Sequence, residues 1–338
     1  MKKDQELQAV SRFKNGRIAV LGDIMMDVYL WGSVTRISPE APVPIVNIQR
    51  RTSCPGGAAN VMRNLASLNA GTAAFGVIGR DSAGKELLSL MENCGISTKG
   101  VITSADRRTT EKCRVVAGAQ QLLRADFEET SQLSDKLRNK LVRSVIALIR
   151  NREIDAVIFD DYAKGTLSTD MLTRIITEAK KYSVITVLDP KPRTSCVTPV
   201  SGLTLLKPNR SEAFALAGIP DPGQVSDPAE DKALARAAKI IFEIWEPENL
   251  LISLANQGMS LYCGDAEPVL IPTLAREVFD VSGAGDTVAA VAALALATGS
   301  TPELAAELAN RAAGIVVGKI GTAPILYDEL LSAIKQER

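Results

Sequence analysis

The chain has 338 residues, 46% of them hydrophobic, and its 39 basic residues balance 39 acidic ones. Such a chain can bury a full core, and its charge balance excludes the basic footprint typical of proteins that bind nucleic acids or anionic membranes. The sequence contains no histidine, which excludes a Ser-His-Asp triad, a His-ligated zinc and a His general base.

Apolar β-rich runs alternate with helical patterns, which indicates parallel strands joined by crossover helices in an α/β fold. In chain order, the sequence predicts a strand at 17–21, a helix at 58–68, a strand at 72–78, a helix at 83–91, a strand at 156–159, a helix at 170–180, strands at 184–188 and 203–206, a helix from Ser211, a strand at 250–253 and a helical C-terminal third.

Two stretches do not fit this alternation of parallel strands and crossover helices. Residues 42–49 and 112–127 are predicted to be antiparallel strands, and we expect them to belong to a small lid over the main sheet, with lid segments at about 28–52 and 106–128. Residues 220–231 are predicted to form a polar surface loop. Without a repeat or a clear linker, the chain is expected to be one domain over residues 1–338.

The N-terminal segment, the longest apolar run and the cysteines are typical of a cytoplasmic protein. Residues 1–17 are polar and lack the apolar core of an export signal, and the apolar run after Asp286 is too short to span a bilayer. We expect no disulfide or zinc site from the five cysteines, because they are scattered without paired spacing: Cys54, Cys94, Cys113, Cys196 and Cys263.

The segment Asp280-Val281-Ser282-Gly283-Ala284-Gly285-Asp286 opens the apolar run 287–298. Its glycines let successive backbone N–H groups converge on an anion, and a following helix would add partial positive charge at its first turn. Asp286 is expected to stay ionised there and to accept a proton from an attacking hydroxyl. The alternative is a plain helix cap.

Polar residues also follow several predicted strands, where open α/β sheets place ligands. Each has a structural alternative, either a turn or a helix start. Asn209 and Glu212 have the capping-box spacing, which is compatible with a ligand role. The strand-end groups are Asp23 with Asp27, residues 55–60 with Asn60, residues 160–165, residues 189–191 with Lys191, and residues 207–212.

Neither a GxGxxG dinucleotide motif after the first strand nor a Walker P-loop is present, so a phosphate site in this chain is expected to be of another kind. From Gly56-Gly57 through Asn209-x-x-Glu212 to Gly283-Ala284-Gly285-Asp286, the chain resembles the ribokinase or pfkB family of carbohydrate kinases over nearly its whole length. That resemblance implies a three-layer α/β/α sandwich with a mostly parallel sheet and a β-strand lid.

Longer segments narrow the resemblance to the heptose 7-phosphate kinases of lipopolysaccharide-core biosynthesis. They are residues 36–44, 56–61, 120–122, 161–165 and 317–319. The resemblance implies ATP-dependent phosphorylation of the anomeric hydroxyl of D-glycero-β-D-manno-heptose 7-phosphate. It implies only the kinase half of the bifunctional relatives, because the HxGH motif of their adenylyltransferase needs histidine.

The resemblance also implies residue roles. Asp286 would be the general base, with the N–H groups of Gly283, Ala284 and Gly285 facing the transferred phosphoryl group. Glu212 would place Mg²⁺ through water. Asn209, Glu212, Lys191, Ser253, Gly258 and Asn310 would contact ATP. Asp27, Gly56, Gly57 and Asn60 would contact the sugar, and candidate cations for its 7-phosphate are Arg36, Lys112, Arg114, Arg124 and Lys164.

Two segments depart from the family pattern. Residues 254–256 lack an expected charged residue near the nucleotide, and residues 323–325 replace a Thr-Val-like stretch. Adenine contacts and a monovalent-cation site therefore stay open. A homodimer through the lid strands is expected. The rival functions are a kinase of another sugar, sugar phosphate or nucleoside, and a non-catalytic sugar-sensing module.

Overall fold

A nine-stranded sheet forms the main body of the computed structural model, which describes residues 2–118, 120–192, 194–264, 266–275, 278–319 and 321–336. Seven adjacent strands of this sheet are parallel to one another, and two antiparallel strands extend it at one edge. In spatial order the strands are β13 (Val269–Ile271), β12 (Met259–Cys263), β11 (Asn249–Ser253), β10 (Leu205–Leu206), β9 (Ile185–Asp189), β8 (Ala156–Asp160), β1 (Arg17–Gly22), β4 (Gly71–Gly79) and β5 (Ser97–Ser104).

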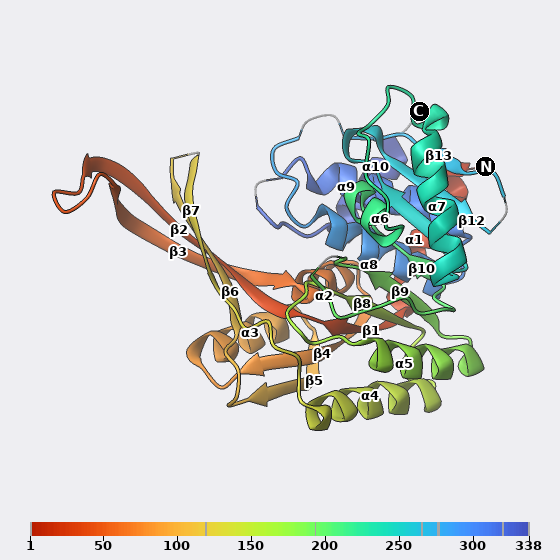
Figure 1. The fold of residues 1–338 in the computed structure, drawn as a ribbon, viewed down its shortest axis with the longest axis horizontal. Helices are drawn as coiled ribbons and strands as arrows, with labels where there is room; N and C mark the ends of the chain where they lie inside the picture. Colours follow the sequence, from red (N-terminus) through yellow and green to blue (C-terminus); the bar gives the residue numbers. More distant parts are fainter. Residues whose placement is uncertain are drawn as a thin grey trace.

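Helices cover both faces of this sheet, so there are two hydrophobic cores. One core packs beneath α1 (Lys2–Ser11), α2 (Ala58–Ser67), α3 (Ser82–Asn93), α8 (Ala284–Ala297), α9 (Pro302–Val316) and α10 (Tyr327–Gln336). The other packs beneath α4 (Asp135–Arg150), α5 (Thr169–Tyr182), α6 (Arg210–Leu216) and α7 (Lys232–Trp245). The result is the three-layer α/β/α arrangement that the resemblance implied (Figure 1).

Helix α8 explains the long apolar run near the C-terminus. The helix is apolar on all sides, and its residues from Asp286 to Ala295 are buried, which is the usual place of such a helix in a soluble core. No helix in the described ranges combines the length and the apolar character needed to cross a bilayer. The buried helix instead fixes the position of its own N-terminus at the sheet.

A second, four-stranded sheet projects from the main body as the lid (Figure 1). Its strands, in spatial order, are β3 (Pro44–Gly57), β2 (Ile24–Ile37), β6 (Thr110–Ala117) and β7 (Gln120–Phe127). Strand β2 pairs antiparallel with β3 and parallel with β6, while β6 and β7 form an antiparallel hairpin. The predicted lid strands are therefore confirmed.

The sequence missed several elements. It did not identify β2 as a strand, because β2 is buried from Ile24 to Val28 and exposed at its far end, so no single alternating pattern runs along it. The C-terminal third is not wholly helical, since β12 and β13 follow β11 in an antiparallel meander. Strand β5 and helices α4 and α7 were also missed. The remaining predicted strands and helices are present within a few residues, and 220–231 is a loop with one short 3₁₀ turn.

Candidate active site

The carboxyl ends of β8 to β11 meet at one edge of the main sheet, where Asp160 of β8 lies directly opposite Asp189 of β9. A cleft of about 710 Å³ opens there. It is lined by all the residues that the sequence assigned to the nucleotide and to phosphoryl transfer: Lys191, Asn209, Glu212, Ser253, Gly258, Asn310, Gly283, Ala284, Gly285 and Asp286. The cleft therefore brings together residues from segments far apart in the chain.

The glycine-rich loop ends at the first turn of α8, as predicted. Gly283 has a φ of +79° and precedes the helix, a conformation that a side chain would strain. A Cβ on Gly283 would also lie 2.6 Å from Nδ2 of Asn60. Ala284 donates its N–H to the carbonyl of Val281 over 3.2 Å, so this donor already has an internal partner. The loop thus brings backbone close to Asn60 at the positive end of α8.

Asp286 is buried, and both of its carboxylate oxygens are held. Asn60 donates to Oδ2 and the Tyr162 hydroxyl donates to Oδ1, each over 2.7 Å. Burial raises the pKa of Asp286, against the lowering effect of the hydrogen bonds from Asn60 and Tyr162 and of the Lys207 charge. Burial thus opposes the lowering of the Asp286 pKa that the helix N-terminus was expected to cause, and a raised pKa makes the carboxylate a stronger general base.

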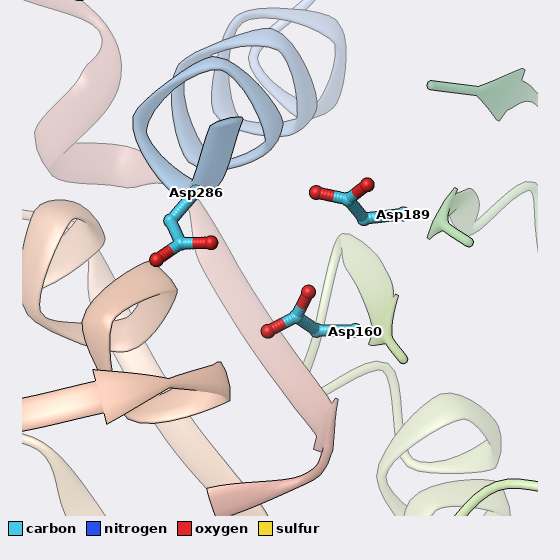
Figure 2. Close-up of side chains that lie close together, drawn as sticks. All are labelled: Asp160, Asp189 and Asp286. Carbon is cyan, nitrogen blue, oxygen red and sulfur yellow. The ribbon is translucent and has the colours of Figure 1, made fainter. Parts of the chain in front are cut away.

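Two further carboxylates lie beside this base. The side chains of Asp160, Asp189 and Asp286 face one another (Figure 2), with an oxygen of each within 4.8 Å of the others. Lys207 lies 3.0 Å from Oδ2 of Asp189. Burial, together with the charge of Asp286, raises the pKa of Asp160 well above its usual range, and burial raises that of Asp189 to about 7. The buried ammonium of Lys207 therefore acts on all three carboxyl groups and lowers the pKa of each.

Asp160 is the exceptional member of this group. Its side chain is 1% exposed, and neither carboxylate oxygen has a hydrogen-bond partner among the described residues. A buried carboxylate without a partner is costly when ionised, so it holds a proton or needs a cation. Together with Asp189, it offers the hard oxygen ligands that Mg²⁺ prefers.

Asn209 and Glu212 form the predicted capping box at the start of α6. The Asn209 side chain accepts from the backbone N–H of Glu212, and Oε2 of Glu212 accepts from the backbone N–H of Asn209 over 2.9 Å. Lys191 donates to the other oxygen, Oε1, over 3.1 Å. Both oxygens of Glu212 are thus used within the protein, each with a lone pair left for water.

The residues expected to contact sugar lie at the junction of lid and main sheet. Asp27 of β2 is buried and forms an ion pair with Arg114 of β6. A Cβ on Gly56 would lie 2.4 Å from Oδ2 of Asp27, so a side chain there would displace the Asp27 carboxylate. Gly57 precedes α2 with a φ of +54°. Asp23 is structural instead, since it accepts three backbone N–H groups of the loop after β8.

The five candidate cations for a substrate phosphate differ in their partners. Arg114 is paired with Asp27, Lys164 with Glu128 over 2.7 Å, and Arg124 with Asp126 over 2.9 Å, while Arg36 is exposed at the far end of β2. Lys112 makes no ion pair within the described part of the chain. Its ammonium lies 5.2 Å from the centre of the Tyr162 ring, and burial lowers its pKa.

Sequence reasoning singled out residues 160–165, 189–191 and 207–212 as strand ends but gave no role to Asp160, Tyr162, Asp189 or Lys207. The signal was present, since each follows an apolar strand whose pattern breaks into charge. The sequence could not show that these residues lie close to Asp286, because Asp286 is more than seventy residues further along the chain.

Known proteins share this sequence pattern. The family described as pfkB family carbohydrate kinase matches residues 15–328. A relative named "Bifunctional protein HldE" from Desulfatibacillum aliphaticivorans is 39% identical over 330 residues, which are 97% of this chain and 65% of that protein. One of the same name from Caulobacter sp. (strain K31) is 42% identical over 320 residues, which are 94% and 63%. The chain thus spans about two thirds of their length.

Solved structures share the fold. An Arabidopsis thaliana ribokinase complexed with ribose and ATP superposes with a TM-score of 0.73 at 19% identity, over 95% of this chain and 99% of that chain. Phosphofructokinase-2 from Escherichia coli in complex with potassium also gives 0.73 at 19% identity, over 95% and 98%. At this identity the likeness establishes the architecture of the chain.

Proposed function

Because the chain belongs to the pfkB family of carbohydrate kinases, we propose that it transfers the terminal phosphoryl group of ATP to the anomeric hydroxyl of D-glycero-β-D-manno-heptose 7-phosphate. The products are the 1,7-bisphosphate and ADP. The observation that carries the proposal is Asp286, a buried carboxylate with a raised pKa, at the N-terminus of α8 and at the edge of the cleft. The relatives named HldE, at 39% and 42% identity, support the heptose substrate.

The chemistry follows from the position of Asp286. Each of its oxygens has one lone pair used by Asn60 or Tyr162 and a second one left to accept the proton of the sugar hydroxyl. The first turn of α8, with Gly283 and Gly285, offers backbone N–H groups and partial positive charge to the phosphoryl group in transfer. Lys207 adds a buried positive charge beside it.

We extend the proposal to ATP and Mg²⁺ as cofactors. Mg²⁺ neutralises phosphate charge and orients the phosphates for in-line transfer when bound. Glu212, through water, remains our proposed ligand, and the unpartnered oxygens of Asp160 beside Asp189 fit a divalent cation as well. A monovalent cation is supported only by the potassium complex of the Escherichia coli phosphofructokinase-2.

The distal phosphate of the substrate is assigned to Lys112. Its ammonium makes no ion pair with the described residues, and its pKa is lowered by burial and, against the charges of Asp27 and Asp126, by those of Lys164 and Arg124. A bound phosphate would supply the close anionic partner that this buried ammonium lacks. Tyr162 contacts both groups, Lys112 over its ring and Asp286 through its hydroxyl. A pyranose of similar size lying beside that ring would place its anomeric hydroxyl at Asp286 and its phosphate at Lys112.

We also propose that a second copy of the chain covers the lid. Large apolar side chains are exposed on it, and its outer strands present unpaired edges, which proteins normally cover. A pair of lids in a homodimer would bury both features. The exposed apolar residues are Val34, Ile37, Val43, Ile48, Leu123 and Phe127.

The test measures ADP release with heptose 7-phosphate, heptose, ribose, fructose phosphates and adenosine, for the unmodified protein and for Asp286→Asn. We expect heptose 7-phosphate to be preferred, and the Asn variant to lose roughly 100-fold or more in turnover while its affinity for ATP stays within a few-fold. Near-normal turnover of the variant would refute the general base. Preference for another acceptor would replace the substrate, and no turnover with any of them would favour a sensing module.

A further inference from the structure

Tyr162 contacts the base directly although no sequence motif assigned it a role. Its hydroxyl donates to Oδ1 of Asp286 over 2.7 Å, while Asn60 of α2 donates to Oδ2 over the same distance. The two donors come from different elements, the loop after β8 and the helix after β3. A carboxylate held at both oxygens cannot rotate about its Cβ–Cγ bond without breaking one of these hydrogen bonds.

The loop that carries Tyr162 is held in a strained conformation. Ala163 has a φ of +56°, in the left-handed region that a residue with a side chain rarely adopts. Asp23 offsets this cost, because its carboxylate accepts from the backbone N–H groups of Tyr162, Lys164 and Thr166 over 2.8, 3.0 and 3.1 Å. Strain that neighbouring contacts enforce is typical of functional sites.

The phenol ring of Tyr162 also reaches the lid. Lys112 lies 5.2 Å from the ring centre, within the range of a cation–π contact, and it belongs to lid strand β6. One side chain thus joins the base to the lid.

We propose that Tyr162 is a positioning residue for Asp286. Its hydroxyl fixes the rotation of the carboxylate, and its ring, in contact with Lys112, sets the position of that carboxylate relative to the lid. The inference rests on the proposed role of Asp286 as general base. With the plane of the carboxylate fixed by Tyr162 and Asn60, the second lone pair of each oxygen has a defined direction, and an acceptor hydroxyl meets it without reorganisation of the base.

The test is Tyr162→Phe, which removes one hydroxyl and keeps the ring against Lys112. We expect kcat to fall roughly 10- to 100-fold, with the KM for ATP within about two-fold, because only the base is disturbed. Since the lost hydrogen bond stabilises the carboxylate form of Asp286, the acidic limb of the kcat/KM profile should move to higher pH by about half a unit or more. Tyr182→Phe, at the end of α5, is the matched control and should change none of these.

A second variant separates positioning from folding. Replacement of Tyr162 by 3-fluorotyrosine keeps its shape and makes the phenol a stronger donor, so the acidic limb should move to lower pH. An unchanged kcat and an unchanged acidic limb in both variants would overturn the proposal. If Asp286→Asn keeps normal turnover, the general base itself fails; if only the Tyr162 variants behave like the unmodified protein, the failure is confined to Tyr162.

Discussion

The cleft edge of the main sheet and the lid carry charge in opposite ways. At the cleft, Lys207 is 3% exposed and Asp160 1%, and carboxylates outnumber the cation that serves them. On the lid, the pair Arg124–Asp126 has side chains 48% and 24% exposed, and large apolar groups face outward. Buried charge lowers the free energy of unfolding, whereas exposed ion pairs contribute little to it. The charged groups of the cleft therefore destabilise the fold, while those of the lid hardly affect it.

The largest expected effect on stability follows from removing the buried cation. Lys207→Met leaves Asp160, Asp189 and Asp286 without it, and breaking a buried pair typically costs about 3–5 kcal/mol in the free energy of unfolding. Urea denaturation near neutral pH measures this loss. Lys232→Met, an exposed lysine at the start of α7, is the control and should change the free energy by less than about 0.5 kcal/mol. Equal stability of the two variants would remove the contrast between cleft and lid.

A smaller effect concerns pH. Burial raises the pKa of Asp189 to about 7 and that of Asp161 to about 6. Carboxyl groups with a raised folded-state pKa keep protons that the unfolded chain has released, so the free energy of unfolding falls as the pH rises from about 4 to about 7. The fall should amount to a few kcal/mol at most. It should be smaller in Asp189→Asn.

The control for this pH effect is Asp328→Asn, an exposed carboxylate on α10. Urea denaturation at pH 4.5 and at pH 7.5 gives the difference for each protein. If the free energy of unfolding of Asp189→Asn falls as steeply with pH as that of the unmodified protein, the buried carboxylates of the cleft do not couple folding to pH.

The contrast between cleft and lid also explains what the sequence could predict. Strand ends such as Asp189 and the capping box of Asn209 and Glu212 are local signals, and the parallel topology makes them converge. The pairing of Asp286 with Tyr162 is not local, and neither is the burial that raises the pKa of Asp286, so Asp286 could be predicted from the sequence but its partners could not. Strand β2 was missed because its two halves have different surroundings.

The smallest expected effect lies on the lid. Arg124→Ala breaks an exposed pair with Asp126, and such pairs contribute about 0–1 kcal/mol, so the free energy of unfolding should hardly change. If Arg124 also helps Lys112 to attract the substrate phosphate, the KM for heptose 7-phosphate should rise by less than about ten-fold, with kcat unchanged, because an exposed cation acts through screened charge.

Lys112→Met should raise the KM for heptose 7-phosphate further than Arg124→Ala does and leave the KM for unphosphorylated heptose unchanged. Steady-state kinetics with both sugars compare the two variants, and a larger effect from Arg124 would move the phosphate site outward along β7.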